Sequence, residues 1–193
     1  MSLDHIIDLI EFDYLKLTNS CKNDLIKASN VLTVSRDTNL VEEGQHARYI
    51  YFIAQGAARA YYLKEGREIT DWFAFENEFI CSIDSFFLDM PSAHAIEVME
   101  PSILLQIPKA SILLLSEKHR DFERLEKMVI TKTLLQLQQR LVSIQFETAQ
   151  QKYENLLKIR KDITQRVPLT HISSYLGISL ETLSRIRNPK QRI

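Results

Sequence analysis

The spacing of hydrophobic and polar positions changes twice along the chain. Residues 4–29 carry apolar side chains at helical spacing and predict helix. From Val31 onward the apolar residues fall in short, β-rich segments separated by turn signals such as Glu65-Gly66. The expected strands are 31–35, 49–56, 57–64, 67–75, 95–99 and 102–107. A hairpin around Glu65-Gly66 and this number of short strands predict an antiparallel jelly-roll barrel.

After Pro108 the pattern becomes helical again for about 40 residues. Within this stretch a heptad seam, with steps of 4, 3, 4 and 3, is formed by Ile130, Leu134, Leu137, Leu141 and Ile144. Such a seam suits pairing with an identical helix, so we expect a homodimer. The alternative is an ordinary helix packed on the barrel.

The stretch "LTHISSYLGISLETLSRIR", from Leu169 to Arg187, predicts two short helices around a tight turn. With Leu169 counted as the first residue, Gly177 is the ninth, where the turn needs positive φ. Ser179 can cap the second helix. Together these features predict a helix-turn-helix unit, and the alternative is a helical hairpin used for packing or dimer contact.

The outward side chains of the second helix carry groups that read DNA. Glu181 can accept a hydrogen bond from cytosine, and Arg185 can donate two to guanine. Hydroxyl side chains in the same helix can reach phosphates or base edges. The expected residues contacting double-stranded DNA are Ser179, Leu180, Glu181, Thr182, Ser184, Arg185 and Arg187.

Charge divides the chain unequally. Residues 148–193 hold nine Lys and Arg against three Asp and Glu, a net charge of +6, while residues 1–147 hold fifteen against twenty-two, a net of −7. A basic end on an acidic body is typical of nucleic-acid binding. Cations near the second helix are expected from Arg160, Lys161, Arg166, Arg187, Lys190 and Arg192. The alternative is a solvated charged surface.

Other site classes find little support. The two cysteines lack metal-ligand spacing, and the five histidines contain no H-x-H pair, so no metal, cofactor or catalysis is expected. The start of the chain lacks a basic leader, and no apolar run approaches the length of a membrane span. We therefore expect a soluble cytoplasmic protein without a membrane partner.

The order of barrel, long helix and "SYLGISLETLSRIR" resembles the Crp/Fnr family of bacterial transcription regulators, Bacteroidetes-type members in particular. "FAFENEFICSIDSFF" and "PSAHAIEVMEPSILLQI" resemble the segment that forms the phosphate-binding cassette in cyclic-nucleotide-binding members. The resemblance implies a homodimer whose sensor adjusts two reading helices on paired DNA half-sites. Glu181 and Arg185 match base-reading positions of the family, and RNA polymerase is a candidate partner.

The sensor departs from the family pattern. Cyclic-nucleotide binders carry Gly-Glu and Arg-Ser where this chain has Cys81-Ser82 and Ser92-Ala93. Without that arginine a phosphate loses its main charge partner, so we expect an unknown small-molecule effector rather than ordinary cAMP binding. The candidate effector-pocket residues are Arg59, Phe79, Cys81, Ser82, Ser92, Ala93 and His94. Of these, Arg59 is expected at the surface and His94 on a solvent-facing strand position.

The expected fold class is α+β in three parts. A cyclic-nucleotide-binding-like sensor covers 1–117, a dimerisation helix 118–147, and a winged helix-turn-helix domain 148–193, with a short hairpin near 161–168 as the wing. The expected function is a sequence-specific DNA-binding transcription regulator. The alternative is a small-ligand signalling module whose basic tail contacts protein rather than DNA.

Overall fold

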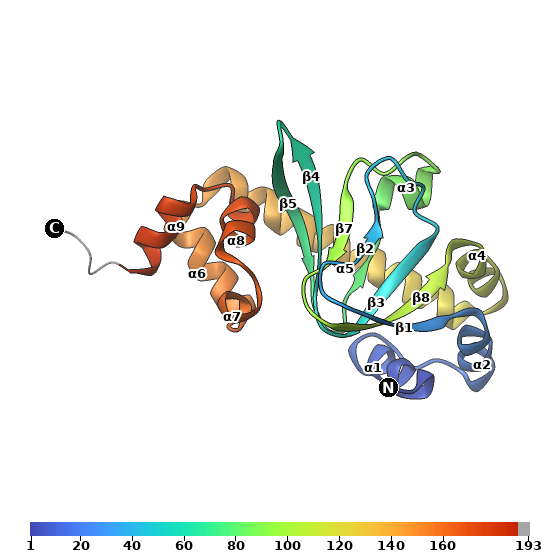
Figure 1. Cartoon of the computed structure of the whole chain (residues 1–193). Coiled ribbons are helices and arrows are strands. Elements are labelled where there is room, and N and C mark those ends of the chain that lie inside the picture. The colour runs from blue at the N-terminus through green and yellow to red at the C-terminus, as the bar shows by residue number, and fades with distance from the viewer. Residues whose placement is uncertain (189–193) are drawn as a thin grey trace.

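The computed structural model describes residues 1–188 and places helices at both ends of two antiparallel sheets (Figure 1). Lys190 and Arg192 lie outside the described residues. The elements are α1 (Leu3–Asp13), α2 (Asn19–Ala28), β1 (Asn30–Val34), β2 (Asn39–Val41), β3 (Tyr49–Gln55), β4 (Ala58–Lys64), β5 (Arg67–Ala74), β6 (Phe79–Ile80), α3 (Ile83–Leu88), β7 (Ala95–Val98), β8 (Ser102–Pro108), α4 (Lys109–Lys118), α5 (Arg120–Phe146), α6 (Ala149–Ile159), α7 (Ile163–Arg166), α8 (Leu169–Leu176) and α9 (Leu180–Arg187).

The hairpin predicted at Glu65-Gly66 is confirmed. Strands β4 and β5 pair antiparallel up to the closing pair Lys64 and Arg67. Both central residues have positive φ, 53° for Glu65 and 73° for Gly66. This is the conformation whose twist matches the twist of the flanking strands.

The predicted jelly-roll barrel is correct in its antiparallel sheets and wrong in that they do not close into a barrel. The strands form two separate four-stranded sheets, in the orders β1-β8-β3-β6 and β2-β7-β4-β5. The edge strands β2 and β6 have only three and two residues. Strands this short offer too few backbone groups to continue the hydrogen bonding from one sheet into the other. Both were missed in the sequence because such short segments show no alternation.

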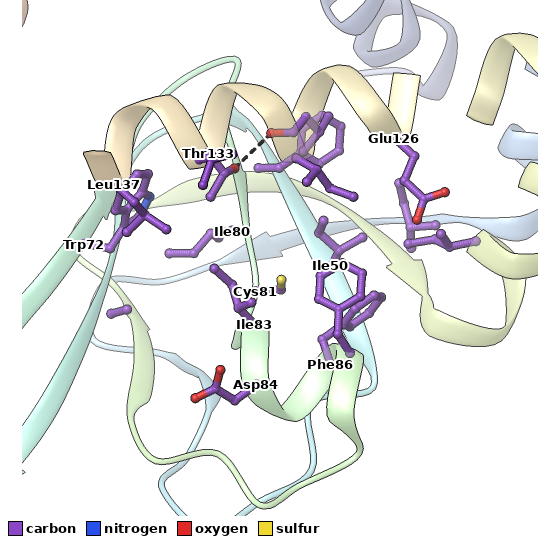
Figure 2. Close-up of a pocket in the computed structure, with 18 of the residues that line it drawn as sticks. Ile50, Trp72, Ile80, Cys81, Ile83, Asp84, Phe86, Glu126, Thr133 and Leu137 are labelled. Carbon is purple, nitrogen blue, oxygen red and sulfur yellow. Dashed lines mark hydrogen bonds between the residues drawn. The ribbon is translucent and has the colours of Figure 1, made fainter. Parts of the chain in front are cut away.

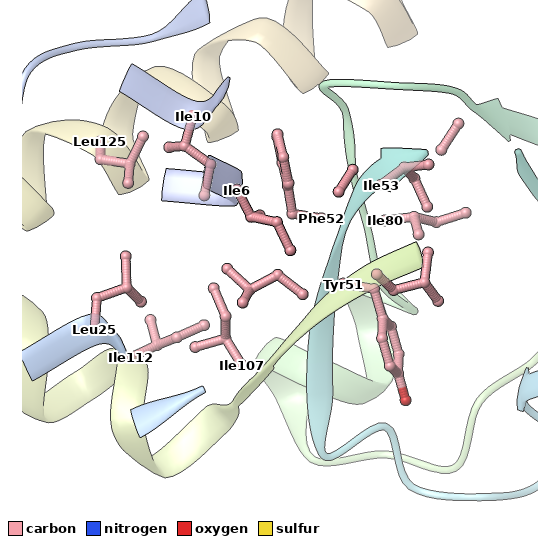
Figure 3. Close-up of a cluster of buried hydrophobic side chains, with 14 of the residues drawn as sticks. Ile6, Ile10, Leu25, Tyr51, Phe52, Ile53, Ile80, Ile107, Ile112 and Leu125 are labelled. Carbon is pink, nitrogen blue, oxygen red and sulfur yellow. The ribbon is translucent and has the colours of Figure 1, made fainter. Parts of the chain in front are cut away.

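The main core lies where the N-terminal helices and α5 pack against β3 and β8 (Figure 3). Ile6, Ile10 and Leu25 are fully buried there, as is Phe52 from β3. Each such side chain contributes about 1.5–3 kcal/mol by leaving water. This packing fixes the first half of α5 against the sensor.

The helical region after Pro108 is not continuous. It breaks at His119, which has extended backbone angles, and the long helix α5 begins at Arg120. The imidazole Nε2 of His119 lies 2.8 Å from a carboxylate oxygen of Asp24 in α2. With 27 residues, α5 spans about 40 Å and runs from the sensor to the C-terminal helices (Figure 1).

The predicted wing is also wrong. Residues 163–166 form the short helix α7, and the described part of the C-terminal region, residues 148–188, contains helices and turns without a strand. Arg166 pairs with Asp162 at 3.0 Å, one helical turn apart, which favours a helical turn over a hairpin. Thr148 and Gln151 form a capping box at the start of α6.

Candidate functional site

Helices α8 and α9 meet at the turn that the sequence predicts. Gly177 has a φ of 65°, and its N–H donates to the carbonyl of Ser174 at 3.1 Å. The hydroxyl of Ser179 accepts a hydrogen bond from the Thr182 N–H at 3.1 Å, so Ser179 caps α9. A left-handed residue followed by a capped helix fixes the direction of α9 relative to α8.

One face of α9 holds the helix to the protein and the other is open. Leu183 is fully buried, and Ile186 packs partly buried against the same cluster. Of the predicted DNA-contacting residues, Thr182 is half-buried and the exposed ones are Ser179, Leu180, Glu181, Ser184, Arg185 and Arg187. The structure therefore places most of them together on a single accessible surface, which we name the α9 face.

The two arginines of the α9 face form no ion pair within the described residues. Neither Arg185 nor Arg187 forms a salt bridge with another described side chain. The pKa of Glu181 lies below its usual range because its own N–H and the Ser179 hydroxyl hydrogen-bond to the carboxylate. The α9 face thus presents two free guanidinium groups and one ionised carboxylate.

Two of the cations expected near the second helix form contacts within the protein instead. Arg166 donates to Glu76 Oε1 at 2.6 Å and to Asp162 at 3.0 Å, and it also pairs with Glu100. Arg160 stacks over the ring of Phe75 at 3.8 Å. These arginines join the C-terminal helices to the sensor, so the basic charge available to a partner is smaller than the sequence count.

The C-terminal helices pack directly on the β4–β5 hairpin. A second hydrophobic cluster combines sensor residues such as Phe73 with Tyr153 and Ile172 of the C-terminal helices. The hydroxyl of Ser174 accepts from the Thr70 N–H at 2.9 Å. Arg140 of α5 stacks over the Tyr175 ring at 4.2 Å. The position of the α9 face is consequently set by the sensor and α5 together.

The heptad positions on α5 are open in the single chain. Their exposed fractions run from 37% to 64% for the set Ile130, Leu134, Leu137, Leu141 and Ile144. The neighbours Leu135 and Val142 are also about half exposed. An uncovered apolar stripe of this length is typical of an interaction surface.

The two serines of the cassette-like segment are buried and bond to each other. The Ser92 hydroxyl lies 2.8 Å from the Ser82 hydroxyl and donates to the His94 carbonyl at 2.6 Å. Ala93, which follows Ser92 in the predicted pocket set, is exposed. The serine positions are therefore internally satisfied, with no hydroxyl left directed at a ligand.

Arg59 and His94 are not at the surface, contrary to the sequence-based expectation. Arg59 is 2% exposed, donates to Glu97 at 2.6 Å and Thr70 at 3.2 Å, and pairs with Glu68. A buried arginine needs such partners, because without them its charge would lose its interactions with water uncompensated. The acidic side chains around Arg59 therefore allow its burial. His94 is 8% exposed.

A cavity of about 420 Å³ lies between the sensor and α5. Figure 2 shows Thr133 and Leu137 of α5 on one side and Asp84 and Phe86 of α3 on the other. Of the predicted effector-pocket residues, three line this cavity: Phe79, Cys81 and His94. Burial raises the pKa of the Cys81 thiol to about 12, so it is an unreactive wall residue.

Sequence reasoning missed the contribution of α5 and of the β4–β5 hairpin to the cavity. Thr133 is one such residue, and Tyr62 and Trp72 are others. The half-buried side chain of Trp72 packs against the main core and also lines the cavity. The one signal in the sequence was a polar residue, Thr133, among mainly apolar positions on one face of this helix.

Residues 31–119 match the family model described as the cyclic nucleotide-binding domain. No curated protein matches the chain in sequence. No described helix is long and apolar enough to cross a membrane.

Several solved structures share the fold. FixK2 from Bradyrhizobium japonicum gives a TM-score of 0.71 at 19% identity, over 83% of each chain. The c-di-GMP-responsive global regulator CLP of Xanthomonas campestris gives 0.68 at 15%, over 90% of this chain and 92% of that one. A CooA mutant from Carboxydothermus hydrogenoformans gives 0.68 at 18%, over 90% and 85%. At these identities the likenesses establish the fold of the chain, and that fold agrees with the one implied by the resemblance to the Crp/Fnr family.

Proposed function

We propose that this chain, which carries a cyclic nucleotide-binding domain and shares the fold of Crp/Fnr regulators, is a sequence-specific DNA-binding transcription regulator that acts as a homodimer. The observation that carries the proposal is the α9 face. It is exposed, polar and basic, and it is fixed by a capped N-terminus and a buried Leu183.

The side chains of the α9 face suit the edges of bases in a major groove. Arg185 can donate two hydrogen bonds to guanine O6 and N7, and Glu181 can accept one from a cytosine amino group. Leu180 is 41% exposed and suits the methyl group of thymine. Arg187 and the hydroxyls of Ser179 and Ser184 can bind phosphates on either side.

A dimer through α5 places two such faces on one duplex. The heptad stripe is uncovered in the single chain, and covering it with a second α5 removes its apolar surface from water. Two α9 faces related by a two-fold axis read half-sites about one helical turn apart. In this scheme residues 1–117 are the sensor, 118–147 the dimerisation helix and 148–193 the DNA-binding domain.

The test is selection of bound duplexes from a random pool at near-physiological salt. We expect a palindromic site with half-sites about ten base pairs apart. Arg185→Ala is then expected to weaken that site by about 1–3 kcal/mol and relax one base preference. Arg120→Ala is the matched control, because it removes another exposed arginine at the start of α5, the end away from α9 (Figure 1).

Other outcomes contradict parts of the proposal. An unchanged base preference in Arg185→Ala would remove that residue from base reading. No enriched sequence, together with a duplex affinity insensitive to salt, would leave the chain as a ligand-binding module whose basic end contacts protein.

A further inference from the structure

The lining of the cavity between the sensor and α5 is predominantly apolar. The cavity is bounded mainly by aliphatic and aromatic side chains, among them Trp72, Phe79 and Phe86. Its volume of about 420 Å³ falls in the range of pockets that hold small organic ligands. Cys81 lies in the middle of this space in Figure 2, facing α5.

The charged groups of the lining disfavour an anion. Among the described residues that line the cavity none is Lys or Arg, whereas Asp71, Asp84 and Glu126 all contribute to the wall. Arg59, the buried cation of the sensor, is outside the lining and is taken up by Glu97 and Glu68. A phosphate placed here would lose water and gain only carboxylate neighbours, which is unfavourable at short range.

His94, one of the lining residues, has a ring nitrogen without a hydrogen-bond partner in the described part of the chain. The Nε2 atom of His94 is buried and makes no hydrogen bond within the described residues. The ring of His94 packs edge-on against Tyr62, with centroids 5.1 Å apart. Burial lowers the pKa of His94, although Asp71 and Asp84 act in the opposite direction, and the lowered pKa favours the neutral imidazole. An unsatisfied buried nitrogen favours a ligand that supplies its missing hydrogen bond.

We propose that this cavity binds a neutral, largely apolar small molecule that carries one hydrogen-bonding group, placed against His94, rather than a nucleotide or another anion. The apolar wall provides the binding energy and His94 provides the orientation. The carboxylates of the wall exclude negatively charged competitors.

Such a ligand would contact the sensor and α5 at once. Thr133 and Leu137 line the cavity from α5, and Leu137 also belongs to the heptad stripe. A ligand in the cavity therefore contacts α5, the helix that we propose forms the dimer. This regulatory part rests on the proposed function, whereas ligand binding itself is independent of DNA.

The test uses three probes with the same ring system, titrated into the full chain by calorimetry at pH 7. Naphthalene is apolar, 2-naphthol adds one neutral hydrogen-bonding group, and 2-naphthoate adds an anion. We expect 2-naphthol to bind about 3–10-fold more tightly than naphthalene, as one net hydrogen bond allows. We expect 2-naphthoate and cAMP to bind more weakly than either.

Three variants locate the probes. His94→Phe keeps a ring of similar size without polar atoms, so the preference for 2-naphthol over naphthalene should disappear. Cys81→Phe fills the cavity and should abolish binding of both, with thermal unfolding used to check its fold. Leu135→Gln is the control, because Leu135 is exposed on α5 outside the cavity lining. It should bind both probes like the wild type.

The proposal is overturned if none of the probes binds, or if 2-naphthoate or cAMP binds most tightly. A preference for 2-naphthol that survives in His94→Phe also overturns it, and this readout decides the matter if Cys81→Phe fails to fold. Loss of binding in Leu135→Gln would place the probes on the exposed stripe instead. If the chain binds 2-naphthol but enriches no duplex, the ligand proposal stands and the proposed DNA binding is contradicted. If the chain enriches a duplex but binds none of the probes, only the ligand proposal is contradicted.

Discussion

Replacing Arg166 by alanine should loosen the attachment of the C-terminal helices to the sensor. Its guanidinium donates to Glu76 at 2.6 and 2.9 Å and to the Gly56 carbonyl at 3.1 Å. It also bonds Asp162 and pairs with Glu100. Removing it takes away the one cation shared by all three carboxylates, and of the described cations only Arg160, at 3.5 Å from both Glu76 and Asp162, remains near them.

The size of the effect follows from burial. Breaking a fully buried ion pair costs about 3–5 kcal/mol, and exposed pairs are worth about 1 kcal/mol or less. The Arg166 side chain is 19% exposed, and its three carboxylate partners are 28–44% exposed, so water screens part of the interaction. We therefore expect Arg166→Ala to lower the free energy of unfolding by about 2–4 kcal/mol.

The measurement is urea unfolding followed by tryptophan fluorescence. Trp72 is the single tryptophan and lies on β5, the strand against which α8 packs. Arg187→Ala is the matched control, since Arg187 is exposed and without an ion pair among the described residues. It should stay within about 0.5 kcal/mol of the wild type.

The effect should also depend on pH. Burial alone raises the pKa of Glu76, but hydrogen bonds from Arg166 and from backbone N–H groups outweigh it and hold the pKa below its usual range. The hydrogen bond from Arg166 likewise lowers the pKa of Asp162. Carboxylates with lowered pKa stabilise the fold above their unfolded values, and this contribution is lost as pH falls through the folded values. The difference between wild type and Arg166→Ala should shrink below about pH 4. A loss below about 0.5 kcal/mol at pH 7, or one that grows in acid, would refute the reasoning.

Two further predictions concern the dimer seam and the glycine turns. Leu141→Glu places a charge on the exposed heptad stripe and should yield monomers in sedimentation. Gln139→Glu, on the opposite side of α5, is the control and should leave the oligomeric state unchanged. A dimeric Leu141→Glu would show that the seam is misassigned. Gly177→Ala forces alanine to adopt a φ of 65° in open space and should lower the unfolding free energy by about 1–2 kcal/mol. Gly56→Ala combines a φ of 99° with a clash against Ser102 and should cost more, so equal midpoints in urea would contradict the packing around Gly56.

Much of the fold is predictable because it depends on local rules. The hairpin at Glu65-Gly66 needs only a turn that tolerates positive φ between two apolar strands. Gly177 and Ser179 determine the end of one helix and the start of the next through contacts within a few residues. These elements could be predicted from sequence because their determinants are adjacent in the chain.

The candidate sites are only partly predictable. The residues of the α9 face follow from helical spacing once Leu183 is assigned to the buried side. The cavity could not be derived in the same way, because its wall combines Tyr62 from a hairpin, Asp84 from α3 and Thr133 from α5. No sequence pattern relates positions so far apart.

The sequence by itself determined the order of the six longer strands and of the helical regions on either side of them, the turn at Gly177, the heptad spacing on α5 and the outward side chains of α9. Only the tertiary structure decided where charges are neutralised. The sequence predicts that Arg166 adds positive charge near the second helix, yet Arg166 pairs with Glu76, ninety positions away, and Arg59 is buried with Glu97. The physical reason is that the free energy of a charged side chain depends on its surroundings in space, and those surroundings exist only after distant segments have packed together.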